Sequence, residues 1–223
     1  MLYLNVSYED KDKAKALGAK WNPNVKKWYV KDRKDYPKFM EFMGDDNILV
    51  LDNLYLIQGF QECFRCHKQT RVIGFGLDKY LAMYKYLEDD NYKYDRQKFA
   101  RDIKLCEKNN FDMHIVGPID PIPSKLYKLI RQKYNYKNRY SKTTHTSSIS
   151  NCCDYCDVLQ GDFYLFYEVD SPFWIDSEEK LEKLKIYKFN LSRDILVSAN
   201  DGWSSFDELF KKHCRIKEFN IEI

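Results

Sequence analysis

The sequence predicts an α+β fold, in which a small N-terminal module precedes a larger mixed-sheet domain built around a zinc-ribbon-like site. Three observations lead to this prediction. Segments with strand-type and helix-type periodicity alternate along the 223 residues, and no internal repeat is evident. Hydrophobic residues make up 44% of the chain, which is enough for a sizeable core. Two Cys-x-x-Cys pairs lie next to predicted strands.

Residues 1–44 form the predicted N-terminal module, with a strand–helix–hairpin–helix order. Ser7 is a suitable N-cap for the first helix, and Gly18 lies near its end. An Asn-Pro-Asn turn at 22–24 separates two short strands. The expected elements are a strand over 2–6, a helix over 9–19, two strands within 21–30 and an amphipathic helix over 35–43.

Residues 45–223 form the predicted second domain. An apolar, β-branched stretch over 48–58 favours a strand. Pro123 starts a helix, since proline is well placed in a first turn. The aromatic stretch 158–169 is predicted to be a long strand, and the polar stretch 137–150 a loop. Strands are also expected over 70–75 and 112–116, with a mainly helical segment over 78–110 between them that contains an insertion-like stretch at 88–96. At the end of the chain, strands are expected over 186–190, 194–199 and 216–223, and a helix over 206–213.

Two cysteine pairs are the predicted metal ligands. Two intervening residues let both thiolates of a pair face the same side of a tight loop, and two such loops complete a tetrahedral four-sulfur site. Because four thiolates leave no open position for water, the predicted Zn²⁺ is structural, one per chain, and contributes folding energy and not catalysis. The predicted ligands are Cys63, Cys66, Cys153 and Cys156.

Two other interpretations of these cysteines remain open. They are either buried, unligated core residues or a thioredoxin-like dithiol, which would need the pair at a helix N-terminus after a strand. Cys152 and His67 are adjacent spare donors that can substitute for a ligand. Cys106 and Cys214 are expected to be ordinary core residues.

A set of short matches runs through the first thirty residues: Lys11-Asp12, Ala14-Lys15, Leu17-Gly18-Ala19, Trp21 and Trp28-Tyr29. Through them this segment resembles a small bacterial domain of uncharacterised function, found at the N-terminus of some plasmid primases and other mobile-element proteins. Its expected fold is also similar to that of small modules attached to annealing helicases. The resemblance implies mobile-element or phage–host biology and supplies no reaction.

The cysteine region resembles hypothetical proteins that join this small domain to paired cysteines. The matching pieces, beyond the first cysteine pair, are 140–144, 151–156 and 159–163. In that pattern a glycine follows each Cys-x-x-Cys loop, or zinc knuckle, and a histidine precedes the second loop. In this chain His67 and Asp157 stand in the glycine positions, and Cys152 stands in the histidine position. These departures leave the four-cysteine site intact and weaken the argument from knuckle geometry.

Residues 124–142 form a basic strip, with seven basic residues, no acidic residue and interleaved tyrosines. Cations that track phosphates, together with rings for base stacking, are typical of a groove for RNA or single-stranded DNA. The alternative is a solvated helix face with core tyrosines. Residues 154–182 carry nine acidic residues, and pairing of the strip with them would favour protein docking instead. The predicted binding residues are Lys125, Lys128, Arg131, Lys133, Tyr134, Tyr136, Lys137, Arg139 and Lys142.

The N-terminal module is also basic, with ten basic and six acidic residues over 1–43. Trp21 and Trp28 flank the hairpin turn. We expect both indoles to be mostly buried, packed on Leu17 and Phe39, because a pair at this spacing usually forms the core of a small module. The alternative is that they are exposed and stack on bases.

The sequence carries no familiar catalytic signature: it has no phosphate loop, no Gly-x-Ser-x-Gly elbow and no His-Glu-x-x-His. His114 lies in an apolar strand and is expected to be a hydrogen-bonded core residue, whereas His145 is expected to be exposed. The N-terminus lacks the pattern of a signal peptide, and the most apolar stretch is too short to span a bilayer. Seven cysteines then indicate a reducing, cytoplasmic setting.

These observations predict a non-catalytic zinc protein that binds nucleic acid or a nucleic-acid-processing complex, without a membrane partner. One alternative is an anti-defence inhibitor or adaptor from a phage or plasmid, which acts by protein–protein contact on, for example, a CRISPR or restriction nuclease. Another is an enzyme with an unfamiliar site. Salt-dependent binding to nucleic acid separates the first two, and turnover would identify the third.

Overall fold

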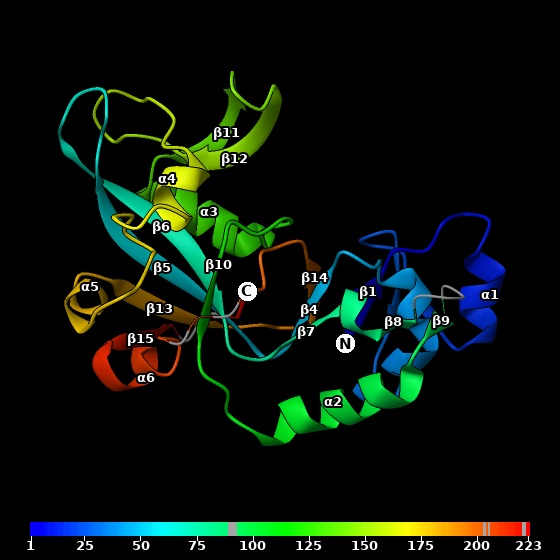
Figure 1. The fold of residues 1–223 in the computed structure, drawn as a ribbon. Coiled ribbons are helices and arrows are strands. Elements are labelled where there is room, and N and C mark those ends of the chain that lie inside the picture. The colour runs from blue at the N-terminus through cyan, green and yellow to red at the C-terminus, as the bar shows by residue number, and fades with distance from the viewer. Residues whose placement is uncertain (89–92, 203, 205, 220–221) are drawn as a thin grey trace. The chain divides into compact units, whose positions relative to one another are not determined.

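The computed structural model describes residues 1–88, 93–202, 204, 206–219 and 222–223, which form two compact units (Figure 1). The predicted α+β class is confirmed, since several sheets are combined with short helices. The chain passes between the units several times. Unit 1 contains Met1–Asn53, Lys79–Phe111 and Leu191–Ser198, and unit 2 contains Leu54–Asp78, Asp112–Asn190 and Ala199–Ile223.

Unit 1 is built from two three-stranded sheets, a short hairpin and helices. The sheets have the strand orders β1-β3-β2 and β14-β4-β7, and β8 pairs with β9. Trp21 lies opposite Trp28 in the β2–β3 pairing. The elements are β1 (Leu2–Leu4), α1 (Lys11–Ala16), β2 (Lys20–Asn22), β3 (Lys27–Val30), η1 (Arg33–Phe42), β4 (Ile48–Val50), β7 (Tyr80–Ala82), η2 (Met83–Tyr86), β8 (Leu87–Glu88), β9 (Lys93–Tyr94), α2 (Arg96–Lys108) and β14 (Ile195–Val197).

The core of unit 1 contains side chains from all three of its segments. Tyr36, Phe39 and Met40 of η1 pack with Phe99 and Ile103 of α2. The N-terminal stretch therefore shares its core with residues far along the chain, and hydrophobic burial stabilises these segments as one body.

Two predictions for the N-terminal stretch are corrected. The helix expected over 35–43 is a 3₁₀ helix, Arg33–Phe42, with Pro37 inside it; proline lacks the N–H that an α-helix interior needs. Trp21 was expected to be buried, but it is 48% exposed. Trp28 is partly buried and packs against the core, so only one of the two indoles matches the expectation.

Unit 2 is organised around a five-stranded sheet with the order β10-β6-β5-β13-β15 and a hairpin, β11–β12. Strands β5 and β6 pair antiparallel from Tyr55–Gly76 to Glu62–Gln69, so both reach the same end of the unit. The elements are β5 (Asn53–Glu62), β6 (Gln69–Leu77), β10 (His114–Gly117), α3 (Ser124–Lys133), β11 (Tyr136–Ser141), β12 (Thr146–Asn151), α4 (Asp162–Phe166), α5 (Glu178–Glu182), β13 (Lys185–Asn190), α6 (Leu209–His213) and β15 (Ile216–Phe219).

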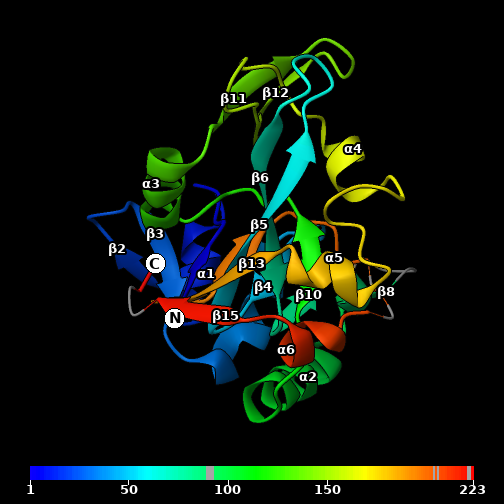
Figure 2. The same cartoon turned by 90° about the vertical axis from the view of Figure 1, so that its left-hand side faces the viewer.

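The loop that follows the β11–β12 hairpin lies beside the connection between β5 and β6 in both views (Figures 1 and 2). This arrangement brings the residues after β12 close to the turn after β5. Each of these two connections carries a Cys-x-x-Cys pair.

Several predicted elements of the second domain differ from the structure. Residues 137–150 form the β11–β12 hairpin and not a loop, because the polar strands pair with each other from Tyr136–Asn151 to Ser141–Thr146. Residues 158–169 contain helix α4 and not a long strand, since Leu165 and Phe166 are buried while Phe163 and Tyr164 are exposed. The first part of 78–110 forms β7, η2, β8 and β9 before α2 begins. Parts of the predicted insertion (89–92) and of the last strand (220–221) lie outside the described residues.

Candidate metal centre

Four cysteine sulfurs converge at one end of unit 2. The Sγ atoms of Cys63, Cys66, Cys153 and Cys156 all lie within 4.8 Å of one another. Cys63 Sγ is 3.6 Å from Cys156 Sγ, and Cys66 Sγ is 3.6 Å from Cys153 Sγ. Sulfurs about 2.3 Å from a tetrahedral zinc ion are about 3.8 Å apart, and a disulfide needs about 2.05 Å. The spacing therefore fits a four-thiolate metal site and not a pair of disulfides.

The two cysteine loops have the same local geometry. The backbone N–H of Cys63 donates to Lys68 O at 3.0 Å, and His67 N–H donates to Cys63 O at 2.8 Å. The second loop repeats both bonds, from Cys153 to Val158 and from Asp157 to Cys153. These bonds curl each loop so that its two thiols face inward.

The residue after each pair adopts the left-handed conformation. His67 has φ 55° and Asp157 has φ 61°. This region favours glycine, which matches the glycine that the resembling pattern carries at these positions. His and Asp tolerate it better than β-branched residues do, so the knuckle geometry survives both departures.

Polar contacts hold the two loops together although the pairs are 87 residues apart. The buried side chain of Asn151 accepts from Ile73 N–H at 2.8 Å and donates to Ile73 O at 2.9 Å. Asp154 N–H donates to Thr70 Oγ1 at 2.9 Å, and Arg71 Nε donates to Asp154 Oδ2 at 2.8 Å. Asn151 at the end of β12 and Asp154 in the second loop are thus both bonded to strand β6, which directly follows the first loop.

The thiols differ in acidity. Burial disfavours the thiolate of Cys63, but hydrogen bonds from the backbone of Cys66 and Arg65 outweigh it and lower the pKa of Cys63 to about 6. Burial also opposes ionisation of Cys153, whose pKa is nevertheless lowered by bonds from the Cys156 and Tyr155 backbone. The Val158 backbone favours the Cys156 thiolate, but burial and the neighbouring thiols raise its pKa to about 12. Full ionisation of the cluster therefore needs a cation.

This difference predicts how uptake of a metal ion depends on pH. At pH 7, Cys63 with a pKa of about 6 is largely a thiolate, whereas Cys156 with a pKa of about 12 must lose its proton on binding. The bound thiols have depressed pKa values, so the stabilisation by metal grows as pH rises and is lost as pH falls. Affinity measured against a chromophoric chelator should rise from pH 6 to 8, by about tenfold per pH unit for each proton released. A flat profile over this range would contradict a thiolate site.

The other candidate donors do not reach the cluster. The His67 ring is exposed, and its Nδ1 lies 3.3 Å from Glu62 Oε1. Cys152 is buried, and its Sγ donates to Ser150 O at 3.8 Å. Burial raises the pKa of the thiols of Cys106 and Cys214 to about 11 each. Neither cysteine pair begins a helix, as the redox interpretation would require.

The basic strip is divided between the surface and the core. Lys125, Lys128, Arg131, Lys133 and Lys142 are exposed. The rings of Tyr134 and Tyr136 are buried, so their predicted role in base stacking is corrected. Lys137 Nζ lies 2.6 Å from Asp157 Oδ1, and Arg139 Nη2 lies 3.0 Å from Asp157 Oδ2. These two cations therefore pair with the acidic stretch, as expected for the protein-docking alternative, and hold the second cysteine loop in place.

Two exposed aromatic side chains at the metal centre were not among the predicted site residues. Phe64 is 67% exposed and Tyr155 is 62% exposed, and each lies between the two cysteines of its pair. Arg65 is exposed beside Phe64, and Lys68 Nζ lies 4.9 Å from the centroid of the Tyr155 ring. The sequence shows an aromatic inside each Cys-x-x-Cys loop, but only the structure shows that both rings are exposed. We call Phe64, Arg65, Lys68 and Tyr155 the knuckle tip.

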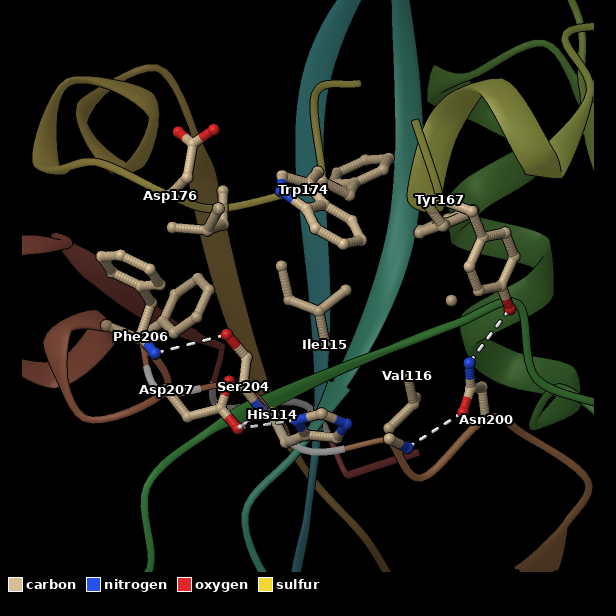
Figure 3. Close-up of a pocket in the computed structure, with 16 residues that line it drawn as sticks. His114, Ile115, Val116, Tyr167, Trp174, Asp176, Asn200, Ser204, Phe206 and Asp207 are labelled. Atoms are coloured by element: carbon tan, nitrogen blue, oxygen red, sulfur yellow. Dashed lines mark hydrogen bonds and ion pairs between the residues drawn. The ribbon is translucent and has the colours of Figure 1, made fainter. Parts of the chain in front are cut away.

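A pocket of about 520 Å³ also opens in unit 2, against strand β10. His114 Nδ1 lies 2.7 Å from Asp207 Oδ2, and both side chains are buried (Figure 3). The Ser204 N–H donates to the same carboxylate oxygen at 3.2 Å, and Phe206 N–H donates to Ser204 Oγ at 3.3 Å. These bonds cap the turn before α6 and agree with the prediction that His114 is a hydrogen-bonded core residue.

Comparison with known proteins covers only the beginning of the chain. Residues 1–43 match a family described as a domain of unknown function (DUF5710). No curated protein and no solved structure matches the chain. Within the described residues, every helix is too short or too polar to cross a bilayer.

Proposed function

We propose that this protein is a non-catalytic, cytoplasmic zinc protein that binds single-stranded nucleic acid, RNA or DNA, with the knuckle tip. The observation that carries the proposal is the exposure of Phe64 and Tyr155 at a centre of four converged thiols. The metal is Zn²⁺, because a tetrahedral four-sulfur donor set suits it and a reducing compartment preserves the thiolates. Filled by four thiolates, the ion has no position for water and serves the fold.

The chemistry of the knuckle tip supports a strand as the ligand. Exposed rings stack on bases regardless of sequence, and each stacked base contributes about 1–3 kcal/mol. Arg65 and Lys68 supply positive charge beside these rings, where a phosphate backbone would pass. Backbone hydrogen bonds restrict the short loops that carry both rings, so little backbone entropy is lost on binding.

The rings are tested by binding of a labelled oligo(dT) or oligo(U) to the zinc-loaded full chain. Phe64→Ala/Tyr155→Ala should weaken binding by about 1–3 kcal/mol per stacked base and leave the salt dependence nearly unchanged. The matched control is Phe163→Ala/Tyr164→Ala, which removes two equally exposed rings from α4 in the same unit. Equal effects of the two double variants would contradict a specific role for the knuckle tip.

The exposed part of the basic strip is tested by the salt slope in the same assay. Neutralising Lys128, Arg131 and Lys142 together should flatten the slope by about two, since each phosphate contact to a single strand contributes about 0.7. Lys137 is left out because it pairs with Asp157. An unchanged slope would mean that these cations only solvate the surface of unit 2.

A second candidate is an adaptor or inhibitor that acts by protein contact. Phe163, Tyr164 and Tyr167 on and after α4 are exposed next to Glu168 and Asp170. Rings beside carboxylates suit a basic protein surface, such as the nucleic-acid groove of a nuclease. In this case Phe163→Ala/Tyr164→Ala would abolish inhibition of the nuclease, and the wild-type chain would show no salt-dependent binding to nucleic acid.

A further inference from the structure

A groove of about 650 Å³ lies in unit 1, between the strand that opens the chain and the first hairpin. It is lined by the apolar side chains of Leu4 and Val6, by the hairpin β2–β3 and by the segment before α1. Its volume is within the range of small-molecule sites. The lining residues that matter here are Tyr8, Lys11, Trp21, Lys26, Lys27 and Trp28.

The aromatic wall of this groove offers free ring surface. Trp21 and Trp28 face each other across the strand pair, with ring centroids 5.5 Å apart at 61°. Trp28 is partly buried and packs against the core, whereas nearly half of Trp21 is exposed. Tyr8 is also exposed, with Lys11 Nζ 3.7 Å from its ring centroid. An indole fixed by an edge contact on one side and open on the other is suited to stacking a planar ligand.

The charged side chains that line the groove are all positive. Lys11, Lys26 and Lys27 line it, and its lining contains no carboxylate. In the described part of the chain no ion pair involves these three lysines. Lys26 lies in the hairpin turn with φ 52°, in the left-handed region. A ligand for this site is therefore both planar and anionic.

We infer that this groove binds a nucleotide unit, with the base stacked on Trp21 and the phosphate held by Lys26 and Lys27. A nucleotide combines a base, which can stack on the indole, with a phosphate, which can pair with the lysines. The site lies in unit 1 and shares no residue with the knuckle tip, so it goes beyond the function proposed above and does not depend on it. The nucleotide is either free or part of a strand, since both carry the same chemistry.

The experiment uses the zinc-loaded full chain with Phe64→Ala/Tyr155→Ala, so that the knuckle tip does not contribute. Fluorescence anisotropy with labelled dT₁₂ should still report binding. Adding Trp21→Ala should weaken it by at least about fivefold, the lower end of the stacking range. Lys26→Gln/Lys27→Gln should weaken it and flatten the salt slope by about 1.4. Trp21→Phe, which keeps a ring, should retain most of the binding, and thermal midpoints show that each variant is folded.

Matched controls separate the groove from general charge and aromatic effects. Lys15→Gln/Lys34→Gln removes the same charge from exposed sites outside the groove, and Trp174→Ala removes a similarly exposed indole from unit 2. Neither should change binding. Thymidine 5′-monophosphate that competes at micromolar concentration would identify a free nucleotide as the ligand, and competition only at far higher concentration would identify a strand. Absence of binding to both probes, or full binding by a folded Trp21→Ala variant, overturns the inference.

The same set of variants distinguishes failure of the two proposals. If the knuckle tip is inert, Phe64→Ala/Tyr155→Ala binds as tightly as wild type and remains sensitive to Trp21. If the groove does not bind, Phe64→Ala/Tyr155→Ala still weakens binding, and Trp21→Ala has no effect in either the wild-type or the Phe64→Ala/Tyr155→Ala background.

Discussion

Cys153→Ser is expected to abolish stoichiometric Zn²⁺ binding and to unfold or loosen unit 2, with a loss of more than about 4 kcal/mol in unfolding free energy. Cys153 is fully buried, and its Sγ lies 3.6 Å from that of Cys66. A structural zinc site supplies free energy that is folding free energy, because the site does not exist in the unfolded chain. Elemental analysis of wild type should show about one zinc ion per chain.

The measurement that locates the effect is amide hydrogen exchange. Protection should fall in β5, β6, β11 and β12, and strands β1 and β3 of unit 1 serve as the internal reference. Cys152→Ser is the matched control, since this neighbouring thiol is buried but lies outside the cluster and donates to Ser150 O. It should keep its zinc. A metal-free wild type that is well folded, or a Cys153→Ser variant with full zinc content and full protection, would refute the assignment.

Arg33→Met is expected to destabilise unit 1 by about 3–5 kcal/mol, because it leaves a buried carboxylate without its charge partner. Asp194 is only 3% exposed. Arg33 reaches it with two bonds, from Nε to Oδ2 at 2.8 Å and from Nη2 to Oδ1 at 2.5 Å. Tyr36 also donates to Asp194 Oδ2 at 2.7 Å. Its hydroxyl would remain as a donor but could not replace the positive charge.

The control for this prediction lies on the same 3₁₀ helix. Lys38→Met removes an exposed ion pair with Asp35, at 2.7 Å, and should change stability by about 0–1 kcal/mol. Hydrogen exchange of β1, β3 and β4 gives the stability of unit 1 in both variants. Similar protection in Arg33→Met and Lys38→Met would show that the pair contributes no more than a surface contact.

The Arg33 network also explains why unit 1 is larger than the N-terminal stretch that sequence comparison detects. Arg33 joins Asp194 to Asp52, at 2.6 Å, and Lys79 Nζ lies 3.1 Å from Asp52 Oδ2. The predicted division into residues 1–44 and 45–223 follows from local patterns along the sequence. Local composition carries no information about which distant segment completes a core or neutralises a buried charge, so the assignment of 79–111 and 191–198 to unit 1 needed the structure.

Secondary structure was predictable where local chemistry decides it. Pro123 predicted helix α3. The β-branched run over 48–58 predicted one strand, and the structure has two there, β4 and β5, with residues 51–52 between them. The prediction failed at residues 137–150, where polar strands are stabilised by pairing with each other. It failed again at 158–169, where α4 turns Leu165 and Phe166 inward and leaves neighbouring aromatics in solvent. Tertiary context overrides propensity in both places.

The sequence by itself determined the donor set of the metal centre. Thiols two residues apart in a tight loop must face the same side, so each Cys-x-x-Cys pair was recognisable without any knowledge of the rest of the chain. Only the tertiary structure decided that the two pairs meet. It also decided that Tyr134 and Tyr136 are buried while Phe64, Tyr155 and Trp21 remain exposed. Which side of a ring faces water depends on packing between segments far apart in the chain, and no local pattern encodes that.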